Sequence, residues 1–220
     1  MPLQHLFLLT SNLQLPTSNI QLFIVASYGN IIPKAILDIP PLGSLNIHPS
    51  LLPKLRGATP IQTAILLGLN ETGITIMLMD EKMDHGPIVA QEKSPLVGSE
   101  SAPELEEKLA IQGAKLLAKT IPFWLEKKIK AIPQNDSEAT FTKKFSKEDG
   151  LIDLNGSAEE NYRKIRAFTG TSGTYFIHEK SGQKIRVRIK ASSFSNGKLH
   201  IERVIPESGK EMNYDDFSKI

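Results

Sequence analysis

Asn46 and His48 stand two residues apart in the segment SLNIH, and a carboxylate, Asp84, follows in the later segment MDHG. If residues 44–48 form a strand, the two-residue period of a strand points Asn46 and His48 from the same face. Pro49 ends such a strand, because proline has no N–H for the ladder and favours an extended residue before it. We therefore expect the pair at the C-terminal end of a strand, where open α/β sheets bind their ligands.

An amide, an imidazole and a carboxylate are groups that suit acyl transfer to an amine. Each residue also has a plainer interpretation. A histidine near a strand end is commonly a hydrogen-bonded structural group, and Asp84, followed by His85 and Gly86, has the composition of a turn. The Asn46 side chain on the same face favours the chemical interpretation of His48. The residues alone leave both interpretations of Asp84 open.

The composition predicts a soluble chain with one large domain, or with a larger and a smaller one. The chain has 220 residues, of which 40% are apolar, and no cysteine. The lack of cysteine excludes a disulfide, a thiolate zinc site and a cysteine nucleophile, and it fits a cytoplasmic protein. An N-terminal apolar patch, Leu6 to Leu9, has no basic residue before it, and no apolar run is long enough to span a bilayer.

The hydrophobic pattern before residue 130 predicts strands that alternate with helices, as in the second half of an α/β unit. One short helix is expected to begin at Pro33, and a second is expected over 58–69 with Pro60 in its first turn. A third, long and amphipathic, is expected over 102–128. Strands are expected at 21–27, 44–48, 71–79 and 87–93, the last two as an antiparallel pair.

A polar stretch, residues 131–150, predicts a linker between a first domain, 1–130, and a second domain, 151–220. In the second domain, Ser157 is expected to cap a helix that runs to Phe168, with Glu160 as its capping-box partner. Strands are expected at 174–177, 185–191 and 198–204, which suits a small β-barrel or sandwich.

The C-terminal part of the chain is the basic one. Residues 1–129 carry a net charge of −1 and residues 130–220 a net charge of +3. Four cations alternate along one predicted strand, Lys184, Arg186, Arg188 and Lys190, which places them on one face. That face is either a solvated outer surface or a contact for a phosphate backbone. Lys54 and Arg56 likewise either steer an anionic ligand or are simply solvated.

Residues 20–130 resemble the catalytic domain of the folate-dependent formyltransferases. The matching segments are 26–38, LNIHPSLLPKLRGATPIQ at 45–62, ETGITIMLMDEKMDHGPI at 71–88 and, in the second domain, KIRAF at 164–168. The resemblance implies a Rossmann-like α/β catalytic domain and a small C-terminal β-barrel-like domain that helps to hold a tRNA. It also implies a cytoplasmic enzyme of protein biosynthesis.

Carried over to this sequence, the resemblance makes Asn46, His48 and Asp84 the catalytic residues. It makes the loop Ser50, Leu51, Leu52 and Pro53 the contact for the folate, and it implies no metal. The implied reaction is formyl transfer from 10-formyltetrahydrofolate to the α-amine of initiator methionyl-tRNA. Asn46 would donate to the formyl oxygen as negative charge develops there, and His48, with an ordinary pKa near ~6.5, would exchange protons at neutral pH.

The family's catalytic domain begins with a strand, a glycine-containing loop and two βα units that this sequence lacks before residue 21. We therefore expect an N-terminally truncated domain whose open strand edge favours association, whereas the complete enzyme is expected to be a monomer. Three other functions stay open at this point. They are formyl transfer to a sugar nucleotide or to glycinamide ribonucleotide, folate binding without turnover, and hydrolysis that releases formate.

Overall fold

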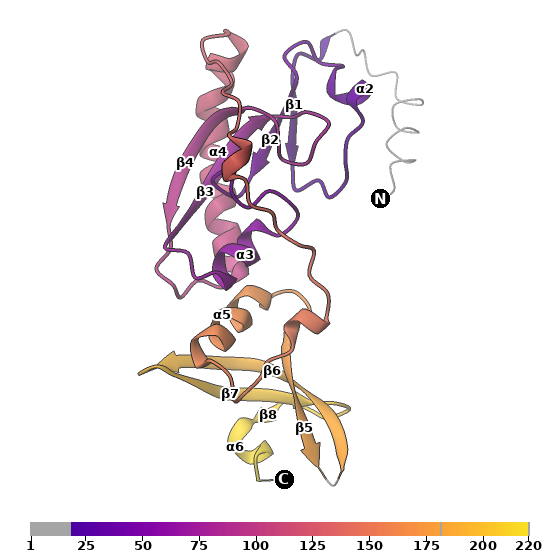
Figure 1. The fold of residues 1–220 in the computed structure, drawn as a ribbon, viewed down its shortest axis with the longest axis vertical. Coiled ribbons are helices and arrows are strands. Elements are labelled where there is room, and N and C mark those ends of the chain that lie inside the picture. The colour runs from indigo at the N-terminus through magenta and orange to yellow at the C-terminus, as the bar shows by residue number, and fades with distance from the viewer. Residues whose placement is uncertain (1–18, 181, 220) are drawn as a thin grey trace.

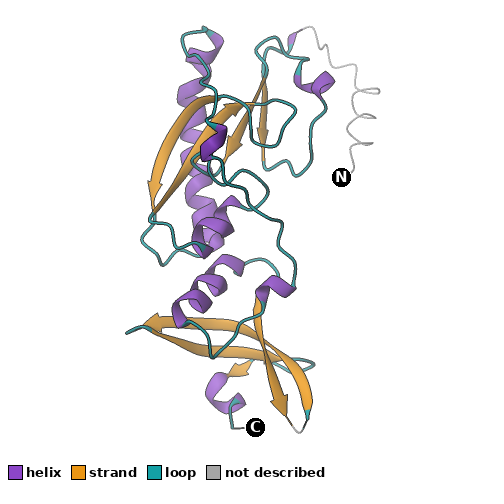
Figure 2. Ribbon diagram, in the orientation of Figure 1, coloured by secondary structure: helices purple, strands orange, loops and turns teal. Residues whose placement is uncertain are grey.

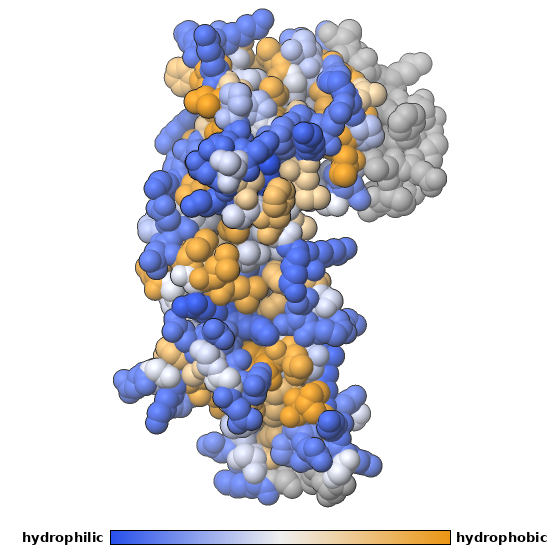
Figure 3. Space-filling view, viewed as in Figure 1, coloured by the Kyte–Doolittle hydropathy of each residue, from blue (hydrophilic) through white to orange (hydrophobic). Residues whose placement is uncertain are grey.

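A computed structural model describes residues 19–180 and 182–219, which form two units stacked along the long axis of the molecule (Figure 1). The apolar patch Leu6 to Leu9 lies outside the described residues. Figure 3 shows hydrophilic side chains over much of one face of the molecule, with hydrophobic patches above and below the junction between the units. Within the described part of the chain, no helix has the length and apolar character needed to cross a bilayer.

The first unit is built on a four-stranded sheet whose order is β1-β2-β3-β4. The parallel pair is β1 (Phe23–Ala26) with β2 (Ser44–His48), and β3 (Glu71–Leu78) is antiparallel both to β2 and to β4 (Ile88–Pro95). The four predicted strands are thus confirmed, including the antiparallel pair. Because β2 is flanked by a strand on each side, Asn46 pairs with Val25 and with Met77.

Among the described residues three α-helices accompany this sheet, and the longest, α4 (Ala102–Leu125), runs along one face of it (Figure 2). Ser101 and Glu104 form a reciprocal capping box at its start. The other two are α2 (Lys34–Leu37), which follows Pro33, and α3 (Pro60–Leu66). Helix α3 is shorter than the predicted 58–69, since Pro60 occupies its first turn and Gly68, with a φ of 60°, follows its end.

The second unit contains one antiparallel sheet in the order β5-β6-β7-β8. Its strands are β5 (Thr174–Lys180), β6 (Gln183–Ser195), β7 (Lys198–Pro206) and β8 (Met212–Asn213). Helix α5 (Ala158–Phe168) precedes the sheet and α6 (Tyr214–Phe217) follows it. Ser157 caps α5 as predicted, because its side chain accepts the backbone N–H of Glu160. These elements confirm a small β-rich domain.

The two units share a hydrophobic cluster. Ala167 and Phe168 from α5 pack with Leu105 and Leu109 from α4 and with Ile65 from α3. All five side chains are nearly or fully buried. The C-terminal unit is therefore packed against the first unit rather than tethered to it.

The segment between the units, for which a linker is predicted, packs against the first unit. Ile132 exchanges two backbone hydrogen bonds of 2.8 Å with Ile88, and Phe141 forms an isolated parallel bridge with Arg56. A short 3-10 helix, η2 (Asp136–Glu138), lies between these two contacts. Four polar side chains of this stretch bond to the loop that follows β2, namely Gln134, Asp136, Thr140 and Thr142.

Candidate active site

A cavity of about 410 Å³ lies at the C-terminal ends of β1 and β2. Asn46, His48 and Asp84 all line it, so the structure brings the three predicted catalytic residues together. Apolar side chains surround them from the loop after β1, from β3 and from the turn after β3: Ile31, Ile32, Met77, Met79 and Met83. A mixed lining of this kind and volume is typical of small-molecule sites.

His48 is 4% exposed and has one ring nitrogen bound to the backbone. Its Nε2 lies 3.0 Å from the Leu55 carbonyl oxygen. A carbonyl oxygen only accepts, so Nε2 carries the hydrogen, and in the neutral ring Nδ1 is left as the basic nitrogen. Nδ1 lies 3.6 Å from Oδ1 of Asp84. The geometry therefore points the basic nitrogen of His48 toward a carboxylate.

Burial is the largest influence on the protonation of His48. It lowers the pKa of the imidazole, while Asp84 and the Leu55 carbonyl act in the opposite direction. The net effect is a lowered pKa, so the ring is neutral at pH 7. A neutral imidazole with a free Nδ1 can accept a proton, and Asp84 stands where it would stabilise the resulting cation.

Asp84 has a positive φ of 49° and two separate contacts with the site. Its Oδ2 accepts the backbone N–H of Gly57 at 2.7 Å, while Oδ1 faces His48. The positive φ agrees with the turn interpretation of Asp84, but a turn former needs neither of the two side-chain contacts. Gly57 is required at its position, because a Cβ there would stand 2.6 Å from Oγ1 of Thr142 and its φ is 116°.

Asn46 stands on the same face of β2 as His48, half-buried at the cavity wall. Two residues of strand separate the two Cα atoms by roughly 7 Å. The pairing of β2 with strands on both sides fixes the backbone from which this amide projects. An amide held in this way can donate to an oxygen between itself and His48.

The loop Ser50 to Pro53 does not line this cavity. Ser50 is fully buried, and its hydroxyl donates to the Lys54 carbonyl at 2.6 Å. The backbone N–H of Leu52 donates to Oγ1 of Thr75 at 3.1 Å. The described contacts of the loop are with the scaffold beneath His48, and its contact with folate stays a prediction.

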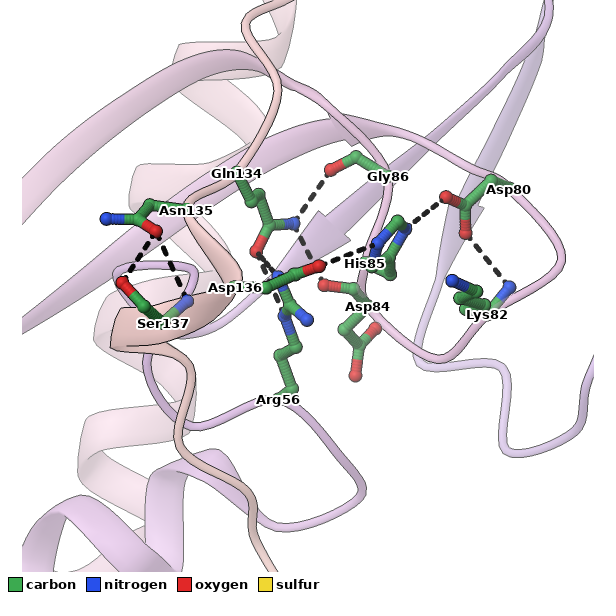
Figure 4. A network of polar contacts seen from close by, with 10 residues as sticks. All are labelled: Arg56, Asp80, Lys82, Asp84, His85, Gly86, Gln134, Asn135, Asp136 and Ser137. Carbon is green, nitrogen blue, oxygen red and sulfur yellow. Dashed lines mark hydrogen bonds and ion pairs between the residues drawn. The ribbon is translucent and has the colours of Figure 1, made fainter.

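Arg56 is buried rather than solvated, with 3% of its surface exposed. Its Nε and Nη2 donate to Oε1 of Gln134 at 3.0 and 2.8 Å, and Nη2 also donates to Asp136 at 2.8 Å. Oδ2 of Asp136 lies 3.4 Å from Nε2 of His85, and Nδ1 of His85 lies 2.5 Å from Oδ2 of Asp80 (Figure 4). The hydrogen bond from Arg56 also lowers the pKa of the Asp136 carboxyl group.

Two groups of residues at the site were missed by the sequence reasoning, one that lines the cavity and one that supports a turn without lining it. The first is the loop Ser27 to Ile32 after β1, which forms one wall of the cavity. Its position after a parallel strand and its Gly29 were available signals. The second is Gln134 and Asp136, which hold the turn that carries Asp84, and their place in a polar stretch gave no signal. Among the described residues, no group of three or more ligand-type side chains is arranged to hold a metal ion.

Two family models match the chain. The model described as "Formyl transferase" matches residues 10–121, and the one described as "Formyl transferase, C-terminal domain" matches residues 144–198. A methionyl-tRNA formyltransferase of Thermus thermophilus is 41% identical over 186 residues, which are 84% of this chain and 59% of that protein. The chain thus spans less than two thirds of the length of that relative.

Solved structures with the same fold include HypX from Aquifex aeolicus in complex with tetrahydrofolic acid, with a TM-score of 0.71 and 15% identity. That match covers 92% of this chain and 39% of HypX. A sugar N-formyltransferase from Shewanella has a TM-score of 0.64 and 21% identity, and the match covers 81% of this chain and 73% of that one. At these identities the two structures show the α/β formyltransferase fold alone. Since the first family model covers half of the chain and the second follows it in order, the chain belongs to the formyl transferase family.

Proposed function

We propose that this chain takes part in formyl transfer from 10-formyltetrahydrofolate to the α-amine of initiator methionyl-tRNA, in the initiation of translation in the cytoplasm. The observation that carries the proposal is the meeting of Asn46, His48 and Asp84 at one cavity. The name of the Thermus thermophilus relative supports the acceptor. The tetrahydrofolic acid bound by HypX, which has the same fold, supports the donor.

In the proposed reaction each of the three residues has one step. As the amine nitrogen bonds to the formyl carbon, the Asn46 amide donates to the formyl oxygen, which gains negative charge. Nδ1 of His48 accepts the proton that the amine loses. Asp84, whose Oδ1 lies 3.6 Å from this nitrogen, stabilises the resulting imidazolium. The carbon–nitrogen bond to the folate then breaks, and His48 returns the proton to the departing nitrogen.

The cavity lining fits a donor with a flat heterocycle. Apolar side chains such as Ile32 and Met77 offer contact area, and polar side chains line the same cavity. Small-molecule sites in general combine apolar contact area with polar groups that orient the ligand. We expect the reacting formyl group beside Asn46 and His48.

An acceptor panel tests the proposal. Purified chain of 220 residues, with its folding confirmed by circular dichroism, is incubated with 10-formyltetrahydrofolate and one acceptor at a time. The acceptors are methionyl-tRNA, an amino-sugar nucleotide and glycinamide ribonucleotide. We expect formylated methionyl-tRNA, at a rate that collapses in His48→Gln. A folded chain that leaves methionyl-tRNA unformylated contradicts the proposal.

A sugar nucleotide is the second candidate acceptor, because a sugar N-formyltransferase shares this fold over 81% of the chain. The same panel decides between the two candidates. Turnover with the amino-sugar nucleotide and none with methionyl-tRNA would support the second candidate. Release of formate in every reaction, with no acceptor formylated, would instead indicate hydrolysis.

A further inference from the structure

The segment 132–142, which leads to the C-terminal unit, contacts the supports of both His48 and Asp84. On the His48 side, Oγ1 of Thr140 accepts the backbone N–H of Leu55 at 2.9 Å, and the Leu55 carbonyl in turn holds His48. Two further backbone bonds join Arg56 to Thr140 and Thr142 at 2.9 and 2.8 Å. The loop that fixes the histidine tautomer is therefore paired along its length with this segment.

On the Asp84 side, one side chain of this segment bonds to the backbone of the turn. Nε2 of Gln134 donates to the backbone carbonyls of Asp84 at 2.9 Å and of Gly86 at 2.7 Å. Its other end, Oε1, accepts two hydrogen bonds from the buried Arg56. All the polar atoms of this amide are thus engaged, and Figure 4 shows it between Arg56 and the turn. A half-buried polar side chain bonded at both ends holds its neighbours in one arrangement.

We propose that Gln134 is a positioning residue, which holds the turn at Asp84 so that the Asp84 carboxylate faces Nδ1 of His48. The inference rests on the proposed function, in which this carboxylate stabilises the imidazolium. Gln134 does not line the cavity, so it acts through Asp84 and not on a substrate. The polar segment before the C-terminal unit thereby becomes part of the catalytic apparatus.

The substitution Gln134→Glu separates the two ends of the side chain. Glutamate keeps the oxygen that accepts from Arg56 and strengthens that contact by its charge. It replaces the N–H donors by an oxygen that repels the carbonyls of Asp84 and Gly86. We therefore expect the fold to be retained while the turn at Asp84 loses the two hydrogen bonds from residue 134. Glu138→Gln is the matched control, because Glu138 belongs to the same segment, is exposed and bonds only to Asn135 within the described residues.

The kinetic test uses formyl transfer by the full chain. For Gln134→Glu we expect kcat to fall about tenfold, which corresponds to ~1.4 kcal/mol, with KM for the formyl donor within about twofold of the parent value. The acid limb of the kcat/KM profile should move to lower pH. Asp84 raises the pKa of His48, and this effect weakens when the Asp84 carboxylate moves away from the imidazole. An unchanged kcat and acid limb, or an equal loss in Glu138→Gln, would overturn the proposal.

A second measurement does not depend on activity. The pKa of His48 is read by NMR titration of the imidazole in the parent chain, in Gln134→Glu and in Glu138→Gln. We expect a lower pKa in Gln134→Glu alone, and equal values in all three chains would overturn the positioning role. If the parent chain transfers no formyl group, the proposed function fails while the titration still decides the role of Gln134. Gln134→Asn, which shortens the side chain and keeps its chemistry, replaces Gln134→Glu if that variant does not fold.

Discussion

His48 has one ring nitrogen available for proton transfer, because the Leu55 carbonyl accepts the hydrogen on the other at 3.0 Å. A backbone carbonyl thereby selects the tautomer, as a second partner commonly does for functional histidines. The direction of the basic nitrogen follows from this bond and not from the histidine alone. Asp84 then determines how stable the protonated ring is.

Substitution of His48 by glutamine should separate chemistry from folding. The glutamine amide can still donate to the Leu55 carbonyl, so we expect a thermal midpoint close to that of the parent chain. It cannot take a proton, and formyl transfer should fall by roughly a hundredfold to ten-thousandfold. His200→Gln, the same change at an exposed position, is the control. Parent-level activity in His48→Gln would refute the assigned role.

The activity should depend on pH in a direction that follows from burial. Burial lowers the pKa of His48 below its ordinary 6.5, and the proposed reaction needs the neutral ring. Activity should therefore be constant near pH 7 and should fall only as the pH drops through the lowered pKa. A kcat/KM profile measured from pH 5 to 8 checks this, and an acid limb centred above pH 6.5 would contradict it.

At the scale of elements, the turn between β3 and β4 places Asp84 opposite His48 of β2. It contains Asp80, Asp84 and His85, and it brings Gly86 into close contact with the backbone of Leu78 at the end of β3. A Cβ on Gly86 would overlap the carbonyl oxygen of Leu78, an atom of the backbone that cannot rotate away. The glycine is therefore required by the close approach of the turn to the strand.

We expect Gly86→Ala to lower the free energy of unfolding by about 1–3 kcal/mol, the usual cost of a forced backbone shift. Because the turn also carries Asp84, activity should fall in the fraction that remains folded. Gly29→Ala is the control for stability, since a Cβ there meets no atom within 4 Å and its φ is not positive. Denaturant unfolding curves compare the two variants, and equal midpoints would show that the turn can shift freely.

At the scale of the whole molecule, the two units are joined by packing as well as by the chain. Phe168, which is 2% exposed, belongs to α5 of the C-terminal unit, yet it lies in one cluster with side chains of α3, β3 and α4. A shared core of this kind couples the unfolding of the parts that contribute to it.

Phe168→Ala should therefore destabilise the first unit as well as the second. We expect a loss of about 3–5 kcal/mol in the free energy of unfolding, as for other buried phenylalanines. The single tryptophan, Trp124, reports on the first unit through its fluorescence, since its Nε1 donates to the Leu42 carbonyl there. Phe141→Ala, at a position 71% exposed, is the control. If the unfolding midpoint reported by Trp124 fluorescence does not shift in Phe168→Ala, the two units unfold independently and the prediction is wrong.

Local patterns in the sequence predicted most of the elements. The strand 44–48 followed from a two-residue alternation ended by proline, and the start of α5 followed from a capping serine, both of which are properties of adjacent residues. The pairing of Asn46 and His48 on one face followed from the same period. The predicted helix 58–69 runs past the end of α3 at Leu66, because one more apolar residue, Leu69, stands beyond Gly68.

By itself the sequence therefore determined most of the strands and helices, the likeness to one family and the shared face of Asn46 and His48. Only the tertiary structure decided which nitrogen of His48 is basic, that Arg56 is buried, and that Gln134 holds the turn of Asp84. The physical reason is distance along the chain. Gln134 and Arg56 are 78 residues apart, and a contact between such residues depends on how whole elements pack, which no local period records.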